Sequence, residues 1–240
     1  MKILAVDTSG VVAGVSIISD GRVVYEAHGI TNYTHSVNMM PMVEEALLQT
    51  GLKLKEMAYV AAVVGPGSFT GVRIGVSTVK GLAHGLQVPC IGINGLEALA
   101  YNGLGHQKVI CPIMDARAGQ VYCAAFIEEN HGLKRCLPDE ALPIEAFLAK
   151  GATIGETFYF VGDGVRPYKE AIQKILGEKA FFAGEGQWYM RGANVGLLAW
   201  EQRDQAVDYL TLEPYYLRAP QAQRQKIAKE KQALGKEKKS

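Results

Sequence analysis

Two acidic residues stand where the chain could meet a phosphate or a metal ion. Asp7 ends the apolar run Lys2–Val6, and Asp115 ends a second apolar run, Val109–Met114. If both runs are strands, each carboxylate lies at a strand end, from which it could face the phosphates and metal of a nucleotide. We identify no Lys or Arg beside these phosphates, so ATP or ADP is expected to bind weakly. The residues expected to line the site are Asp7, Thr8, Asp115, Gly162 and Gly164.

The other reactive side chains do not converge on a catalytic set. The five histidines are scattered without the HExxH spacing of a zinc site, so no metal centre is expected. Serine, histidine and aspartate occur without the nucleophile elbow of a hydrolase. A small ATP-dependent kinase or ATPase is the alternative, with Asp7 or Asp115 holding the metal. Phosphoryl transfer relies on several convergent charges, which favours a non-catalytic role here.

A glycine-rich segment, Gly65–Gly71, lies between a predicted strand and a predicted helix and could cradle a phosphate. It lacks the Gly-Lys-Ser/Thr ending of a Walker A loop, since Val72 and Arg73 follow Gly71. A dinucleotide fingerprint would place an acid after the next strand, where Asn94 stands. The favoured interpretation is a tight turn in which Ser68 or Thr70 caps the helix.

Two predicted helices carry features of a contact surface. Ser36–Gln49 is apolar on more sides than one core face uses, with three methionines around Pro41. Gly71–Leu86 carries small residues at four-residue spacing, which permit close approach of another helix. The alternative for the first helix is burial within its own chain. The residues assigned to a partner interface are Val37, Met39, Met40, Met42, Val43, Leu47, Arg73 and Gly75.

Apolar runs and turn signals divide the chain into two halves. The first half is predicted to contain strands at Lys2–Val6, Val11–Ile18, Arg22–Ala27, Ala58–Val64 and Val88–Ile93, with the two helices above between them. The second half repeats this order with strands at Val109–Met114, Val121–Ile127, Leu133–Leu137 and Phe158–Val161, and helices at Pro143–Ala149, Arg166–Leu176 and Ala193–Gln202. The repeated order, with an acid after each first strand, indicates internal duplication. We expect an α/β protein of two lobes with mixed sheets, 1–104 and 105–218, the last helix packing back on the first lobe.

Composition and charge are those of a folded protein of the cytoplasm. Hydrophobic residues make up 48% of the 240 residues, and no apolar run approaches the length of a membrane span. The four cysteines lack CxxC spacing and are expected to be reduced and buried. The net charge is +1, but the segment 219–240 has seven basic and two acidic residues. This +5 tail, expected to be disordered, leaves −4 on the rest of the chain.

Several longer motifs resemble one family. They are MKILAVDTS at the start, THS at Thr34–Ser36, GPGSFTGVRIG at Gly65–Gly75, MDARAGQVY at Met114–Tyr122 and, more weakly, YLR at Tyr216–Arg218. Together they resemble the TsaB (YeaZ) family over nearly the whole chain. The resemblance implies the duplicated actin/Hsp70-like, sugar-kinase-type fold.

The resemblance also implies a function in making threonylcarbamoyladenosine beside the tRNA anticodon. In this family the transfer belongs to a TsaD-type catalytic subunit with a His-based metal site, of which this chain keeps His35 without further ligands. The implied role is therefore a non-catalytic subunit without a cofactor of its own. Implied partners are the TsaD-type subunit, a TsaE-type ATPase and, through the complex, tRNA. Without TsaD the same surface is expected to form a homodimer.

Overall fold

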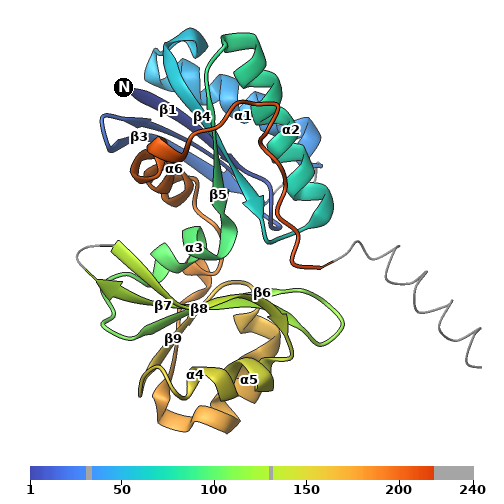
Figure 1. Cartoon of the computed structure of the whole chain (residues 1–240), viewed down its shortest axis with the longest axis vertical. Coiled ribbons are helices and arrows are strands. Elements are labelled where there is room, and N and C mark those ends of the chain that lie inside the picture. Colours follow the sequence, from blue (N-terminus) through green and yellow to red (C-terminus); the bar gives the residue numbers. More distant parts are fainter. Residues whose placement is uncertain (31–33, 130–131, 219–240) are drawn as a thin grey trace, which may run out of the picture.

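The computed structural model describes residues 1–30, 34–129 and 132–218, which form two stacked lobes (Figure 1). Each lobe is built on a five-stranded mixed sheet. The strand order is β3-β2-β1-β4-β5 in the N-lobe and, read from the same end, β8-β7-β6-β9-β10 in the C-lobe. The two orders are equivalent, which confirms the duplicated α/β fold.

Each repeat runs β-β-β-α-β-α-β-α. The N-terminal repeat is β1 (Lys2–Asp7), β2 (Ala13–Ser19), β3 (Arg22–Gly29), α1 (His35–Thr50), β4 (Met57–Gly65), α2 (Phe69–Leu86), β5 (Cys90–Asn94) and α3 (Gly95–Ala100). The C-terminal repeat is β6 (Val109–Asp115), β7 (Val121–Glu129), β8 (Gly132–Leu142), α4 (Ile144–Gly151), β9 (Phe158–Val161), α5 (Val165–Leu176), β10 (Ala180–Phe182) and α6 (Gly192–Glu201). Short 3-10 turns are η1 (Leu54–Glu56), η2 (Tyr101–Gly103), η3 (Gly177–Lys179), η4 (Glu185–Gln187) and η5 (Arg203–Gln205).

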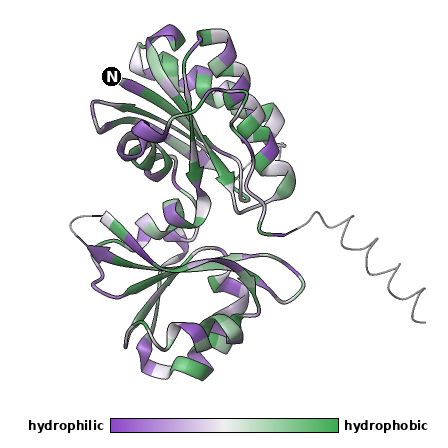
Figure 2. Ribbon diagram, in the orientation of Figure 1, coloured by the Kyte–Doolittle hydropathy of each residue, from purple (hydrophilic) through white to green (hydrophobic). Residues whose placement is uncertain are grey.

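The N-lobe sheet is covered on both faces, which explains why β1 is apolar without alternation. Leu4 and Val6 face α1 and α2, whereas Ile3 and Ala5 face α6. The β2–β3 hairpin turns through Asp20 and Gly21, both at positive φ, as the Asp-Gly signal predicts. Figure 2 shows the resulting concentration of hydrophobic residues on the strands of both lobes.

The last helix of each repeat packs against the other lobe. α6 follows the C-terminal repeat but lies on β1, β2 and β3, and α3 follows the N-terminal repeat but lies on β6 and β7. Both helices contribute to one apolar cluster between the two sheets, in which Leu99 of α3 and Leu198 of α6 are fully buried. The lobes are therefore joined by two exchanged helices as well as by the chain itself.

Sequence reasoning missed two elements. α3 is six residues long, too short for a periodic pattern, although Asn94 caps it by accepting a hydrogen bond from the Glu97 amide (2.9 Å). β10 has three residues and pairs only with β9 within the described chain. All the helices and strands that were predicted are present, with ends shifted by a few residues. β8 differs most, since it extends to Leu142 rather than Leu137.

Three of the four cysteines are buried, as expected, and the fourth is not. Cys90, Cys111 and Cys123 are buried and Cys136 is half-buried. Burial raises the pKa of Cys90 to about 11, so the thiol stays protonated and unreactive. No helix in the described ranges has the length and apolarity to cross a membrane.

Candidate functional site

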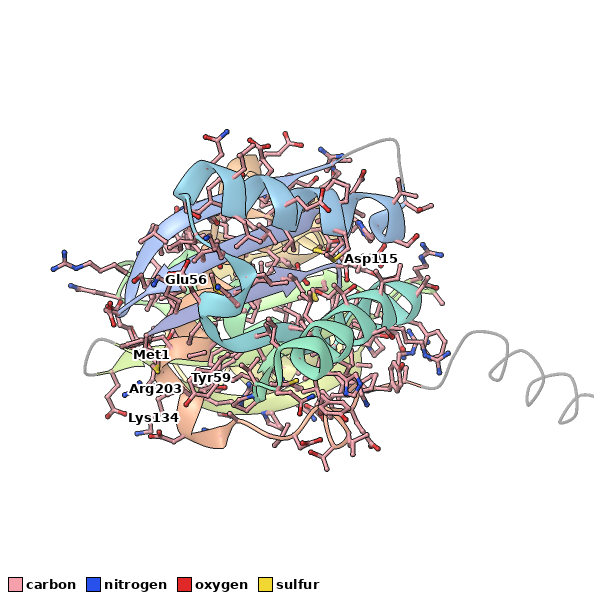
Figure 3. The ribbon with its side chains drawn as sticks, turned by 90° about the horizontal axis from the view of Figure 1, so that it is seen from above. Met1, Glu56, Tyr59, Asp115, Lys134 and Arg203 are labelled. Carbon is pink, nitrogen blue, oxygen red and sulfur yellow. The ribbon has the colours of Figure 1, made fainter. Side chains whose placement is uncertain are left out.

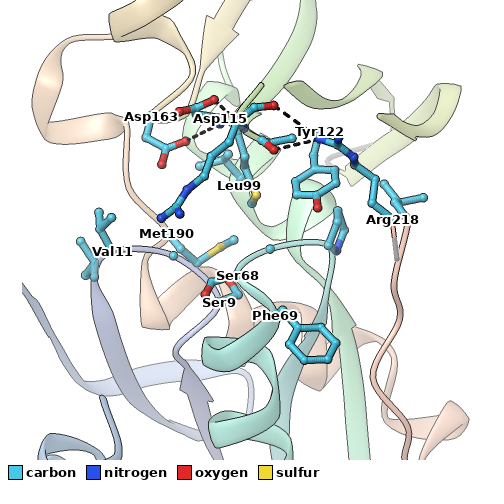
Figure 4. A pocket seen from close by; sticks show the side chains of 18 of the residues that line it. Ser9, Val11, Ser68, Phe69, Leu99, Asp115, Tyr122, Asp163, Met190 and Arg218 are labelled. Atoms are coloured by element: carbon cyan, nitrogen blue, oxygen red, sulfur yellow. Dashed lines mark hydrogen bonds between the residues drawn. The ribbon is translucent and has the colours of Figure 1, made fainter. Parts of the chain in front are cut away.

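A cleft of about 630 Å³ opens between the lobes (Figure 4). Its N-lobe wall is the loop Ser9–Val12 after β1 and the segment Pro66–Thr70, which comprises the turn before α2 and the first two residues of that helix. Its C-lobe wall includes the end of β6 and the loop that follows it. The C-terminal segment, residues 215–218, lines the remaining side.

The end of β1 forms the floor on the N-lobe side. The Asp7 side chain is buried, and its Oδ1 accepts a hydrogen bond from the Ser9 amide (2.8 Å). Asp7 Oδ2 and Ser9 Oγ are buried without a hydrogen-bond partner among the described residues. Burial raises the pKa of Asp7, and this effect is partly opposed by the hydrogen bond from the Ser9 amide and by the nearby His35. Asp7 therefore lies beneath the cleft wall, and Ser9 lines the cleft with its hydroxyl buried.

The glycine-rich segment is a capped turn. Ser68 Oγ accepts a hydrogen bond from the Gly71 amide (3.3 Å), so Ser68 is the N-cap residue of α2. Thr8 is buried here, and its Oγ1 donates to the Gly71 carbonyl (2.7 Å). A Cβ on Gly71 would lie 1.9 Å from the Thr8 carbonyl oxygen. This glycine therefore allows the start of α2 to touch the end of β1.

The C-lobe wall centres on Asp115. Its Oδ1 accepts a hydrogen bond from the Arg117 amide (2.8 Å), and its own amide donates to Asp163 Oδ1 (3.1 Å). Burial raises the pKa of Asp163, and the nearby negative charge of Asp115 raises it further. Gly162 and Gly164 do not line the cleft. They pack on β6, where a Cβ would lie 2.1 Å and 2.9 Å from the Ile113 carbonyl oxygen.

Of the five residues predicted to line a nucleotide site, Asp115 faces the cleft, whereas Asp7, Thr8, Gly162 and Gly164 support its walls. Sequence reasoning missed two cations that line the cleft, Arg117 and Arg218. Both lie inside motifs that the sequence offered, the MDAR and YLR segments. It also missed the aromatic lining: Phe69, Tyr122, Trp188, Tyr189, Tyr215 and Tyr216.

His35, the histidine of the THS motif, does not take part in a ligand set. Its Nε2 lies 2.9 Å from the Gly10 carbonyl oxygen. Within residues 1–30, 34–129 and 132–218 there is no group of three or more His, Cys, Asp or Glu side chains that could hold a metal ion.

The helix α1 exposes three large apolar side chains, here called the apolar stripe. Val37 is 58% exposed, Met40 39% and Leu48 73%, and all three lie on one side of the helix, where the exposed Glu44 stands between Met40 and Leu48. Met42 and Leu47 are half-buried and pack against the N-lobe core. Met39 and Val43 are each only 1% exposed, so assigning them to a partner surface was wrong. Their side chains fill the core between α1 and the sheet.

The helix α2, drawn with its side chains in Figure 3, lies next to α1. Its surroundings divide its surface into three faces. Val72, Val76 and Val79 face the core. Gly75 is also buried, where a Cβ would lie 2.8 Å from Thr8 Oγ1, so its placement at a partner interface was wrong as well. A second face, which includes Arg73, contacts the C-terminal segment. The third face is open.

The open face of α2 is lined by small side chains. Gly81 and Gly85 are exposed, and a Cβ added to either would meet nothing within 4 Å. Ser77 is exposed on the same side of the helix. A second helix could therefore approach the α2 backbone closely here.

Comparisons with known proteins identify relatives over most of the chain. The family model described as "TsaD: tRNA N6-adenosine threonylcarbamoyltransferase" matches residues 28–226. The tRNA threonylcarbamoyladenosine biosynthesis protein TsaB of Bacillus subtilis is 33% identical over 96% of this chain and 100% of its own length. The crystal structure of YeaZ from Pseudomonas aeruginosa superposes with a TM-score of 0.73 at 25% identity, covering 90% of this chain and 99% of that one. Component A of the (R)-2-hydroxyglutaryl-CoA dehydratase of Acidaminococcus fermentans (TM-score 0.50, 12% identity, covering 85% of this chain and 99% of that chain) shares the fold alone.

Proposed function

The chain belongs to the TsaB family of tRNA threonylcarbamoyladenosine biosynthesis proteins, and we propose that it acts there as a non-catalytic subunit that docks a TsaD-type catalytic subunit through α1 and α2. The observation that carries this proposal is the apolar stripe of α1, Val37, Met40 and Leu48, next to the open small-residue face of α2. Large aliphatic side chains exposed together are typical of a surface that another protein covers.

The exposed residues of α1 would supply part of the free energy of docking. Fully burying one large aliphatic side chain contributes about 1.5–3 kcal/mol. Because Val37, Met40 and Leu48 are 58%, 39% and 73% exposed, covering them contributes less than three full burials, and contacts on the open face of α2 must supply the rest of the roughly 8 kcal/mol of a micromolar complex. Two helices from each partner would form a four-helix contact. Without TsaD, the same stripe is proposed to pair with a second copy of itself in a two-fold homodimer.

The proposal is tested with one charged and one steric variant. Leu48→Asp places a charge in the stripe, and Gly81→Leu fills the open face of α2. Both variants should stay folded, lose co-purification with the TsaD subunit of the same cell and lose the homodimer in light scattering. Ile175→Asp is the matched control, because Ile175 is 51% exposed on α5 of the other lobe.

If the folded Leu48→Asp and Gly81→Leu variants still bind TsaD and still dimerise, the docking surface is elsewhere. The non-catalytic role has its own readout. The isolated chain, supplied with the adenylate and tRNA but no TsaD, should modify no tRNA. Modification by this chain alone would instead favour an enzyme.

The chain is further proposed to need no cofactor of its own and to bind ATP or ADP only weakly in the cleft. Asp7 lies beneath the wall rather than in the cleft, and the Ser68 cap already occupies the Gly71 amide of α2. Arg218 donates to two backbone carbonyls. Calorimetry with Mg-ATP should give no submicromolar binding. A submicromolar site abolished by Asp115→Asn would instead support the kinase or ATPase alternative.

The remaining proposed partners are a TsaE-type ATPase and, through the complex, tRNA. The basic segment 219–240 is proposed to help hold tRNA by its +5 charge. It lies outside the described residues, so the support for this role is its composition.

A further inference from the structure

The C-terminal segment 206–218, here named the strap, returns from α6 along the N-lobe (Figure 1). It is anchored first at the edge of the sheet, where Val207 and Cys90 exchange two backbone hydrogen bonds of 2.8 Å. Leu212 is then buried in the N-lobe core beside β5. The strap is thus part of the folded N-lobe although it comes last in the sequence.

The strap next runs along one face of α2. Lys80 Nζ donates to the carbonyls of Leu210 (3.4 Å) and Leu212 (3.1 Å). Nearer the start of the helix, Arg73 Nε donates to the Tyr216 hydroxyl (2.9 Å), and the Tyr216 ring lies 5.0 Å from that of Phe69. These contacts lead the strap from the far end of α2 to the mouth of the cleft.

At the mouth the strap presses against the end of β4. The Tyr215 amide donates to the Val64 carbonyl (2.7 Å). Gly65 has a φ of 130°, and a Cβ there would lie 2.1 Å from the Tyr215 carbonyl oxygen. Any residue other than glycine at position 65 would therefore clash with the strap in its observed position.

Arg218 then crosses to the other lobe. Its Nη1 donates to the carbonyls of Ala116 (2.9 Å) and Arg117 (3.4 Å) in the loop after β6. In this loop Arg117, Ala118 and Gly119 are all at positive φ, between 53° and 72°. Non-glycine residues disfavour that conformation, so the loop depends on external support. Asp115 supports the loop by accepting a hydrogen bond from the Arg117 amide, and Arg218 supports it by donating to the two carbonyls (Figure 4).

The chain also crosses between the lobes from β5 into α3 and from β10 back to α6. From this arrangement we propose that the strap is a clasp that controls access to the cleft, with Arg218 as the residue that fastens it to the C-lobe. When Arg218 is bound to the Ala116 and Arg117 carbonyls, the segment 215–218 covers one side of the cleft. When it is released, the mouth opens and the loop 116–119 loses a support.

The test measures access to the cleft floor in the isolated full-length chain, so it is independent of TsaD docking. Met190 lines the cleft and is buried, and Met190→Cys provides a reporter thiol there. Its reaction with N-ethylmaleimide is followed by peptide mass spectrometry. The half-buried native Cys136 is the internal reference.

Two variants release the clasp in different ways. Arg218→Met removes the link to the C-lobe, and Arg73→Met removes the hydrogen bond to the Tyr216 hydroxyl. Arg224→Met removes the same charge from the tail and is the matched control. We expect Arg218→Met to speed modification of residue 190 about tenfold, the effect of losing a charge-assisted hydrogen bond on an opening equilibrium. Arg73→Met should have a smaller effect and Arg224→Met none.

Equal rates in all variants would overturn the clasp. The same holds if Arg224→Met accelerates the reaction as much as Arg218→Met, since charge alone would then explain it. A parallel acceleration at Cys136 would mean that the fold loosens as a whole, and would also count against the clasp.

Discussion

At the scale of single residues, the glycines of α2 differ in what they do, and this difference could not be predicted from their spacing. Gly71 and Gly75 pack against Thr8 at the end of β1, whereas Gly81 and Gly85 face open space. Both pairs have the same four-residue spacing. This spacing shows that two residues share a face of the helix, but it does not show what covers that face. The role of each face depends on the packing of β1 against α2, which joins segments far apart in the sequence.

This difference predicts opposite effects of alanine at two glycines of one helix. Gly71→Ala should destabilise the protein by about 1–3 kcal/mol, because its Cβ would overlap the Thr8 carbonyl. Gly81→Ala should stabilise it by about 0.4–1 kcal/mol, because alanine lowers the entropy of the unfolded chain and meets no neighbour. Urea unfolding of the two variants measures both. Equal effects would contradict the packing of α2 described above.

The buried carboxylate of Asp7 predicts a pH dependence of stability. Its folded pKa is raised above the ordinary value of 3.8, chiefly by burial. Between these two pKa values the folded protein binds a proton that the unfolded chain does not, so stability falls as pH rises through this window. The Asp7→Asn variant has no carboxyl group at this position and so does not lose stability in this way. The free energy of unfolding of the variant, relative to that of the parent, should therefore increase with pH across the window and then level off.

Asp20→Asn is the control with the opposite sign. The N-terminal ammonium group lowers the pKa of Asp20, so that carboxylate stabilises the fold above pH 3.8 and loses the effect on acidification. Urea unfolding from about pH 2 to pH 7 follows both variants, because the Asp20 window lies below pH 3.8 and the Asp7 window lies above it. Parallel pH profiles for the two would contradict the assigned burial of Asp7.

At the scale of elements, periodicity predicted α1 and most of the strands, but not which residues of α1 face the core. Because the helix has apolar residues on several sides, the sequence does not show which of Met39 and Leu48 faces the core. The structure separates them, since Met39 fills the N-lobe core and Leu48 is exposed. The strands were easier to predict, because burial on both faces makes them continuous apolar runs.

The two residues should respond differently to truncation. Met39→Ala should cost about 2–5 kcal/mol by leaving a cavity between α1 and the sheet. Leu48→Ala should change stability by no more than about 0.5 kcal/mol, since its side chain is solvent-exposed. Thermal and urea unfolding of the isolated chain compare them. Similar losses of stability in both variants would mean that the α1 stripe is covered within the chain.

At the scale of the whole molecule, the duplication was predictable and the cleft was not. Two apolar strands followed by acids indicated two related halves, and the equivalent sheet orders confirm them. The lining of the cleft comes from segments far apart in the sequence, among them those around residues 10, 68, 116, 189 and 216. No local pattern joins these segments, because the helices α3 and α6 and the strap bring them together.

The basic tail predicts a salt dependence for the assembled complex. A chain ending at Arg218 keeps the strap and removes five net positive charges. If the tail binds tRNA, log K against log salt should become flatter by up to about 0.9 for each phosphate that the shortened chain no longer neutralises. Filter binding of the complex at several salt concentrations measures the slope. An unchanged slope would exclude the tail from tRNA binding.

The exchange of α3 and α6 has a consequence for the order in which the protein can fold during synthesis. The face of the first sheet that carries Ile3 and Ala5 is covered by α6, which begins at Gly192, and Leu212 completes the opposite face. When the ribosome has made the first hundred residues, one face of that sheet still lacks its cover. The N-lobe therefore cannot complete its folding until nearly the whole chain has been synthesised. A nascent chain stalled between the lobes would expose apolar strands to chaperones and to other nascent chains.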